Sequence, residues 1–276
     1  MSDMQNKDGE RIAKFLARAG VASRRDSEKL IEAGRIKVNG KVLTTPAFKV
    51  TEKDDILFDG KKVAKQAPRL WRYHKPEGLM TTHKDPEGRP TVFDALPKEL
   101  PRVISVGRLD MNSEGLLLLT NDGELARALE LPATGWVRRY RARAYGKITQ
   151  DDLNELQKGI KIEGVPTGPI EAVLERQQRD NAWIQVSIKE GKNREVRRAL
   201  ETVGLRVNRL IRTSYGPFQL NNLEKGKTEE IRNRILRDQV GHLVDIPKIE
   251  TPEKTPRSKP KKPYAGKPSK QHRRRK

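Results

Sequence analysis

The chain has 276 residues, of which 34% are hydrophobic, and its 58 Lys and Arg against 37 Asp and Glu give a formal net charge of +21. It has no cysteine, which excludes disulfide bonds, thiolate metal sites and cysteine nucleophiles. A protein this basic is attracted to polyanions, so we expect a nucleic acid as its partner.

The first eleven residues are polar and lack the apolar core of a signal peptide. No apolar run approaches the roughly 18 residues that a membrane span needs. The four histidines show no spacing typical of metal ligands. We therefore expect a cytoplasmic protein that neither binds a membrane nor holds a metal.

The amino-terminal residues predict two helices and a hairpin. Residues 12–19 carry apolar side chains at i, i+3, i+4 and i+7, the pattern of a short amphipathic helix. A second helix is expected to begin after Ser23, a good N-cap, and to end at Gly34. Residues 35–43 surround an Asn-Gly pair, which is typical of a tight β-hairpin.

Basic side chains surround the second helix and the hairpin, and charge alone leaves open whether they bind RNA or form a solvated face. The string GVASRRDSEKLIEAGRIKVNG resembles the RNA-binding module named after small-subunit ribosomal protein four. The resemblance covers residues 10–66, and residues 67–69 are expected to be a linker. It implies that RNA is bound by Arg24, Arg25, Lys29, Arg35 and Lys37.

Residues 70–240 mix helix and strand patterns without the regular alternation that a parallel doubly wound sheet requires. This predicts an α+β domain of catalytic size. Helix patterns occupy residues 124–129, 151–158 and 194–203, and strand patterns occupy residues 103–106, 116–120, 137–145, 182–188 and 206–211.

The strand expected at 137–145 is strongly two-sided. Because side chains alternate along a strand, Arg139, Arg141 and Arg143 lie on one face, and Tyr140 and Ala142 lie on the other. The arginine side is either an RNA contact or the solvent side of an ordinary amphipathic edge strand. We expect Arg139 and Arg141 to bind RNA.

Residues 246–276 hold six prolines, twelve Lys or Arg and two Asp or Glu, so this segment carries +10 of the net charge. Such a composition buries too little apolar surface to offset the entropy of ordering. We expect a disordered tail that either binds RNA loosely or only aids solubility.

One carboxylate has an unusual place in the sequence. Asp110 lies in a polar loop between the apolar strand at 103–106 and a run of four leucines. Holding a charge against a core without a partner costs several kcal/mol. Asp110 is therefore the first candidate for a catalytic residue, the alternative being a loop aspartate that accepts backbone hydrogen bonds.

Four segments read together resemble the RsuA/RluB branch of the pseudouridine synthases, over residues 10–237. They are KPEG at 75–78, GRLDMNSEGLLLLTNDG at 107–123, the strand around Tyr140, and EGKNREVRR at 190–198. The resemblance implies a mixed, mainly antiparallel sheet with flanking helices. RPTVF at 89–93 and the last segment point closer to the RluB group, which modifies large-subunit (23S) rRNA.

The resemblance implies a reaction without cofactor or metal, in which one uridine of rRNA becomes pseudouridine. An ionised Asp110 would act as the nucleophile or stabilise developing positive charge. Arg108 would help to extrude the base and position the substrate, unless it forms only a structural salt bridge. Tyr140 would stack on the extruded uracil, with simple packing as the alternative.

A basic residue is expected to pair with Asp110 and keep it ionised. The family pattern nominates Arg197, although Arg198 and the expected substrate-binding residues Lys192 and Arg194 contest the role. Lys75 is expected to shape the floor of the pocket and bind substrate.

Three alternatives accompany this interpretation: a synthase acting on small-subunit (16S) rRNA, a non-catalytic ribosome assembly protein, and a different RNA enzyme. A methyltransferase or synthetase is disfavoured because no GxGxxG loop or synthetase nucleotide signature is visible. The expected partner is rRNA or the pre-ribosomal large subunit, and the expected state is a monomer.

Overall fold

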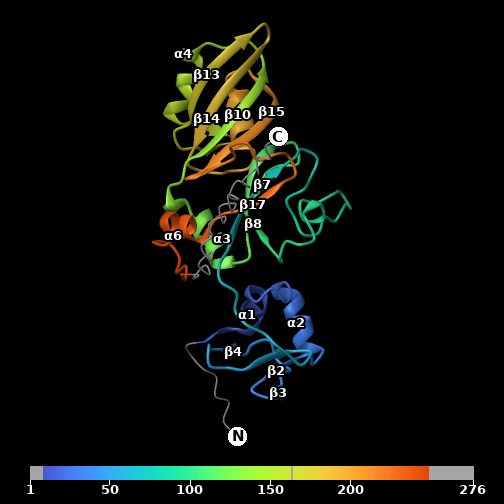
Figure 1. Ribbon diagram of the computed structural model, residues 1–276. Coiled ribbons are helices and arrows are strands. Elements are labelled where there is room, and N and C mark those ends of the chain that lie inside the picture. Colours follow the sequence, from blue (N-terminus) through green and yellow to red (C-terminus); the bar gives the residue numbers. More distant parts are fainter. Residues whose placement is uncertain (1–8, 163, 249–276) are drawn as a thin grey trace, which may run out of the picture.

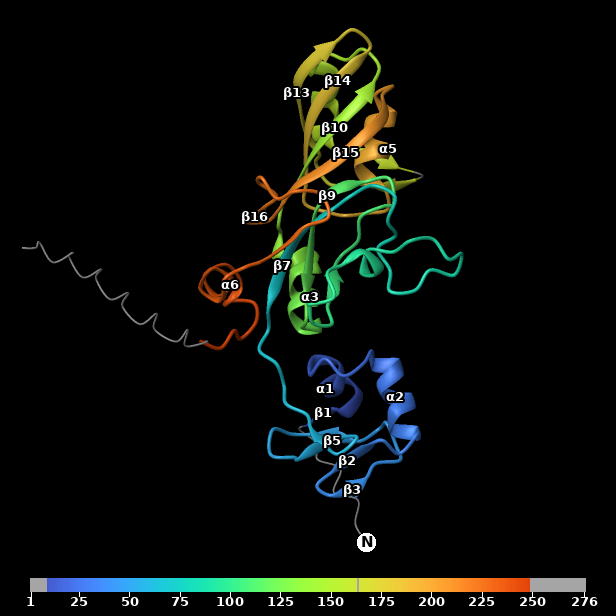
Figure 2. The same cartoon turned by 45° about the vertical axis from the view of Figure 1, so that its right-hand side comes forward.

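The computed structural model describes residues 9–162 and 164–248. A small amino-terminal domain lies at one end of the molecule, and a long sheet with its helices forms the rest (Figures 1 and 2). The elements of the small domain are β1 (Glu10–Arg11), α1 (Ile12–Arg18), α2 (Arg24–Glu32), β2 (Ile36–Val38), β3 (Lys41–Val42), β4 (Lys49–Val50), β5 (Ile56–Phe58) and β6 (Lys61–Lys62).

The two expected helices and the hairpin are confirmed. Ser23 caps α2 by accepting a hydrogen bond from the Asp26 amide at 3.1 Å. Asn39 and Gly40 both have positive φ, as a tight hairpin turn between β2 and β3 requires. Apolar side chains of α1, α2 and the strands form a separate core that includes Ile12 and Ile31.

The larger domain contains a nine-stranded sheet whose principal order is β13-β14-β10-β15-β9-β7-β17. Its strands are β7 (Leu70–Lys75), β8 (Ile104–Val106), β9 (Glu114–Thr120), β10 (Arg138–Tyr145), β13 (Glu171–Gln178), β14 (Asn181–Ile188), β15 (Arg206–Tyr215), β16 (Phe218–Gln219) and β17 (Thr228–Glu230). The helices are α3 (Gly123–Glu130), α4 (Gln150–Asn154), α5 (Glu195–Thr202) and α6 (Asn233–Val240), with 3₁₀ turns at Phe93–Ala95, Pro132–Thr134 and Glu155–Lys158 and a small pair of strands, β11 (Lys161–Ile162) and β12 (Val165–Pro166).

The sheet is mixed and mostly antiparallel, as expected, with a parallel pairing between β15 and β9. Alternate leucines of β9 enter two different cores. Leu117 and Leu119 pack on the side where α4 and α5 lie, whereas Leu116 and Leu118 pack on the side where α3 and α6 lie. This explains why the four-leucine run is buried on both faces.

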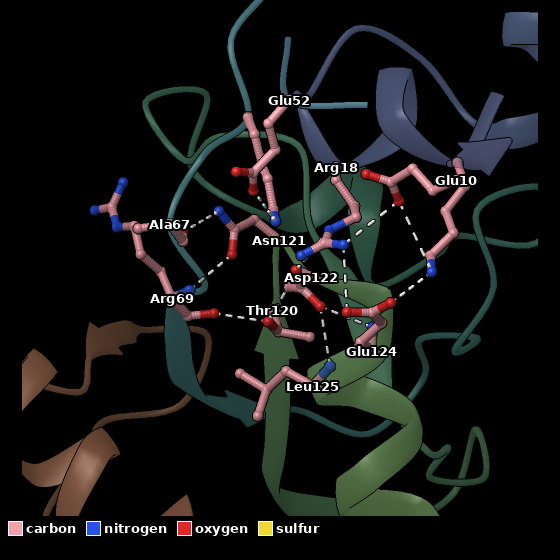
Figure 3. A network of polar contacts seen from close by, with 12 residues as sticks. Glu10, Arg18, Glu52, Ala67, Arg69, Thr120, Asn121, Asp122, Glu124 and Leu125 are labelled. Atoms are coloured by element: carbon pink, nitrogen blue, oxygen red, sulfur yellow. Dashed lines mark hydrogen bonds and ion pairs between the residues drawn. The ribbon is translucent and has the colours of Figure 1, made fainter. Parts of the chain in front are cut away.

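Polar contacts join the small domain to the start of α3 (Figure 3). Asp122 caps α3 and is only 2% exposed, and its Oδ2 lies 3.0 Å from Nε of Arg18 in α1. Lys14 of α1 lies 2.5 Å from Glu124 in the first turn of α3. Asn121 donates to the Ala67 carbonyl and so holds the connecting segment as well.

The sequence assigned Ile246 to the tail, and this assignment is wrong. Ile246 is 6% exposed and packs in the core formed by α3 and α6, where Leu243 and Val244 pack as well, because burying its large aliphatic side chain is favourable. Residues 249–276 of the expected tail lie outside the described residues. No helix in the described ranges is long and apolar enough to cross a membrane.

Candidate active site

The loop that carries Asp110 is fixed by its own backbone and by its neighbours. The Ser113 amide donates to the Asp110 carbonyl at 3.0 Å and closes a turn. Leu109 is 6% exposed and packs in the core, where its carbonyl accepts a hydrogen bond from the Thr81 hydroxyl at 2.7 Å. The Asp110 side chain, in contrast, remains 38% exposed. The loop therefore holds the carboxylate at the surface of a rigid turn.

Lys75, at the end of β7, lies beneath this loop and is fully buried. Its Nζ donates to four carbonyls, those of Pro76, Asp110, Met111 and Ser113, at 2.9–3.3 Å. Burial lowers the pKa of Lys75 to about 8, although the nearby acidic groups Asp110, Glu77 and Glu114 oppose this shift. The structure does not support the expected direct contact of Lys75 with substrate, because the buried Nζ is directed at backbone carbonyls. Lys75 forms the floor of the site.

The ion pair to Asp110 comes from Arg194, whose Nη1 lies 3.5 Å from the Asp110 carboxylate. Arg194 is the residue before α5 and has a left-handed backbone, with φ of 51°. Its side chain is 41% exposed, so the pair is open to water and to an incoming phosphate. The expectation that Arg197 makes this pair is corrected: the structure brings Arg194 there.

Arg197 instead ties α5 to the loop and the sheet. Its two terminal nitrogens donate to the Asn112 carbonyl at 2.7 Å and the Val207 carbonyl at 2.9 Å. Burial lowers the pKa of Arg197 and the neighbouring Arg194 adds to this effect, whereas Asp110 opposes it. Arg197 therefore acts on Asp110 at a distance and through the loop backbone.

Tyr140 lies on the face of β10 that meets the core, 8% exposed, in the same apolar cluster as Leu109. Tyr145 lies on the opposite face and is 49% exposed. The alternation expected along this strand is confirmed, since Arg139, Arg141 and Arg143 are all exposed. β10 is nevertheless a central strand between β14 and β15, which excludes the edge-strand alternative.

Arg108 is exposed beside Asp110, and among residues 9–162 and 164–248 its side chain has no ion pair or hydrogen bond, so it is free to meet a ligand. Lys192 is turned elsewhere: its Nζ lies 2.6 Å from the Pro166 carbonyl and 2.5 Å from Glu190. The structure thus brings Arg194 to Asp110, leaves Arg108 exposed two residues before it, and holds Lys192 at the β12 segment.

The five basic residues expected to bind RNA in the small domain are all exposed. Lys29 lies 3.5 Å from Asp26, and Arg35 pairs with Asp59 and lies over the Phe58 ring. Such exposed pairs are weak and exchange readily for a phosphate. The face is therefore accessible to a polyanion.

Sequence reasoning missed a second acid next to the loop. Glu114, the first residue of β9, is 1% exposed and is paired with Arg209 at 2.5 Å and Lys225 at 2.6 Å. Burial would raise the pKa of Glu114, but hydrogen bonds from Lys225 and Arg209 outweigh it and lower the pKa. In the sequence, Glu114 is marked only by being a charged residue at the start of an apolar run. Its partners could not be predicted because they lie about 100 residues away in the chain. Glu114 anchors the end of the loop.

The arrangement presents one accessible carboxylate paired with Arg194, an exposed arginine two residues before it, and Tyr140 in the core cluster that also holds Leu109. Such a carboxylate suits nucleophilic or electrostatic catalysis at a sugar or base, with arginine holding phosphate. Within the described residues, no group of three or more His, Asp or Glu side chains is placed to hold a metal ion.

Comparisons with known proteins agree with this arrangement. Residues 69–202 match the family model for RNA pseudouridylate synthases, and residues 10–56 match that of the S4 domain. An uncharacterized RNA pseudouridine synthase of Rickettsia felis is 50% identical over 228 residues, which are 82% of this chain and 99% of the relative. Ribosomal large subunit pseudouridine synthase B of Salmonella typhimurium is 42% identical over 247 residues, 86% of this chain and 84% of the relative.

A crystal structure of a pseudouridylate synthase, 24% identical, has the same fold, with a TM-score of 0.58 over 84% of this chain and 99% of that one. Fold and relatives together define a pseudouridine synthase that carries an S4 domain. Within that class, the chain belongs to the RsuA/RluB family.

Proposed function

We propose that this enzyme converts one uridine of large-subunit rRNA to pseudouridine, with Asp110 as its catalytic carboxylate and without a cofactor. The proposal rests most directly on the accessible Asp110 carboxylate, 38% exposed on a loop that buried Lys75 fixes from below. The relatives named as large-subunit synthases support the substrate class.

In the reaction, the bond between C1′ of the ribose and N1 of the uracil breaks, the base turns, and a bond forms between C1′ and C5. C5 then loses its proton and N1, freed from the sugar, gains one, so the product is an isomer of the substrate. An ionised Asp110 adds to the sugar or base, or stabilises the positive charge that develops on the sugar, and divides one difficult step into easier ones. Arg194 places a positive charge 3.5 Å from this carboxylate.

A stacked uridine hides these atoms, so the base must leave the stack, at a cost of a few kcal/mol. Arg108 is exposed two residues before Asp110. Its planar guanidinium can stack in the space that the base leaves, and its charge can bind the adjoining phosphates. The ring of Tyr140 then receives the uracil, and its hydroxyl can take part in removing the C5 proton.

The small domain supplies sequence-independent affinity through its exposed arginines and lysines. The interpretation as a non-catalytic assembly factor is set aside, because the larger domain belongs to an enzyme family. Action on small-subunit rRNA remains the second candidate, and the experiment separates the two.

Pseudouridines are mapped in both rRNAs from cells that lack this protein, from cells that express it, and from cells that express Asp110→Asn. We expect one large-subunit site that disappears with the protein, returns with the wild type and fails to return with the variant. A lost site in small-subunit rRNA would move the proposal to that RNA, and unchanged maps of both would refute it.

A further inference from the structure

One part of the larger sheet, around β10 and β14, is covered by helices on one side only. The helices α4 and α5 cover the side on which Tyr140 lies, together with Leu153, Ala199 and Leu200 of that core. The opposite side of β10, β14 and the amino-terminal part of β15 is exposed, and Figure 2 shows α5 to one side of these strands. This open side, here called the arginine face, carries Arg139, Arg141, Arg143, Trp183, Arg206 and Tyr145.

Arginine and aromatic side chains alternate across this face. Arg141 lies over the Trp183 ring at 4.3 Å, and Arg206 lies over the Tyr145 ring at 5.5 Å. Arg143 is directly opposite Trp183 in the strand register. Planar cations between flat rings are the combination that holds RNA backbone and stacks unpaired bases.

The positive charge of the face is only partly neutralised from within. Glu175 pairs with Arg141 at 2.7 Å, but the side chains of Arg139 and Arg143 make no ion pair or hydrogen bond with any residue in the described ranges. Arg139 and Arg143 flank Arg141 on the central strand β10, and their like charges repel one another. An anion bound on this face would therefore be stabilised. Phosphate is the anion that this enzyme's substrate offers in quantity.

We propose that the arginine face binds a second segment of the RNA substrate, remote from the uridine in the active site. This rests on the proposed function in that the substrate is a large RNA. Arg139 and Arg141 flank Tyr140 on β10 but point to the other side of the sheet, so a segment bound here has passed around the sheet edge. A short RNA that reaches only Asp110 does not reach this face.

The test variant is Arg139→Gln/Arg143→Gln, which removes two unpaired charges from an exposed surface. The matched control is Arg232→Gln/Arg234→Gln, which removes two exposed charges at α6. Each protein is titrated with an unmodified full-length transcript of large-subunit rRNA and with the shortest fragment that is still modified, at several salt concentrations. Thermal unfolding checks that both variants are folded.

We expect the test variant to bind the full-length transcript about 10-fold more weakly at ~0.1 M salt, with a salt slope smaller by roughly 1.5, as the loss of two phosphate contacts implies. Binding of the short fragment, and all binding by the control, should stay unchanged. Unchanged affinity for the long transcript, an equal loss on the short fragment, or an equal loss in the control would each overturn the proposal. If wild type makes no pseudouridine, the proposed function fails, while the comparison of the test and control variants on the full-length transcript still tests the face.

Discussion

Asp110 owes its position to two residues that never need to touch the substrate. Lys75 donates hydrogen bonds to the carbonyls of Asp110, Met111 and Ser113. Arg197 donates a hydrogen bond to the carbonyl of Asn112. A carboxylate fixed in this way loses little entropy when the reaction begins, because its loop is already ordered.

Lys75→Met tests the role of this buried cation through pH. Burial lowers the pKa of Lys75 from 10.5 to about 8, so between these values the unfolded chain binds more protons than the folded one. The free energy of unfolding of the wild type should therefore rise with pH across this window, by up to about 3 kcal/mol relative to Lys75→Met. Urea unfolding of both proteins at pH 7.5 and pH 10 measures this difference, and parallel curves would contradict the assignment.

The sequence predicted the identity of these residues better than their contacts. Asp110, Arg108 and Tyr140 could be located because a motif and a two-residue alternation mark them. The partner of Asp110 could not, because Arg194 and Arg197 lie three residues apart at a helix start. Which of them turns toward the loop depends on the left-handed backbone at Arg194, which no local pattern indicates.

At the scale of elements, α5 connects β14 and β15 to the loop between β8 and β9. The residue before the helix, Arg194, supplies an exposed cation to the carboxylate, and Arg197 within it supplies a buried cation to the loop backbone. We therefore expect Arg194 to contribute mainly to catalysis and Arg197 mainly to stability, although they lie only three residues apart.

Arg194→Gln and Arg197→Gln should accordingly differ. Loss of the exposed pair should change the free energy of unfolding by less than about 1 kcal/mol but slow single-turnover isomerisation roughly 10-fold, equivalent to ~1.4 kcal/mol. Loss of Arg197 removes its hydrogen bonds to one buried and one part-buried carbonyl and should destabilise the protein by roughly 2–4 kcal/mol. Denaturant unfolding and single-turnover rates measure both effects, and equal behaviour of the two variants would show that the division is wrong.

Elements with a clear period were predicted well, and the others were not. The period-two pattern predicted β10. A central strand can keep this pattern because the side of β10 that carries its exposed arginines is open to water. β7 and β13 were not identified, since Leu70–Lys75 is buried almost throughout and Glu171–Gln178 is mostly polar. α6 was also missed because only Leu236 and Val240 mark its buried side.

At the scale of the whole molecule, the two domains have separate cores and a polar joint. Ion pairs from Arg18 and Lys14 to Asp122 and Glu124 hold the small domain at the start of α3. Asp122 is almost completely buried there, which makes this contact less sensitive to salt than an exposed pair. The joint sets the distance between the RNA-binding helices and the active site.

Deletion of residues 1–66 should weaken RNA binding without unfolding the larger domain, whose cores it does not enter. The loss should shrink as salt rises, because the contacts removed are with phosphate. Filter binding of a large-subunit rRNA transcript at several salt concentrations measures this. The point variant Arg24→Gln/Arg25→Gln, which leaves the joint intact, should reproduce part of the loss, and unchanged affinity across salt would defeat the assignment.

The central claim is that Asp110 performs the isomerisation, and purified protein tests it most directly. Wild type and Asp110→Asn are incubated in excess with an unmodified large-subunit rRNA transcript, and pseudouridine formation and RNA affinity are measured together. We predict that Asp110→Asn, which keeps the size of the side chain, binds the transcript as the wild type does and forms no pseudouridine. Pseudouridine formed by the variant at the wild-type rate would contradict the account.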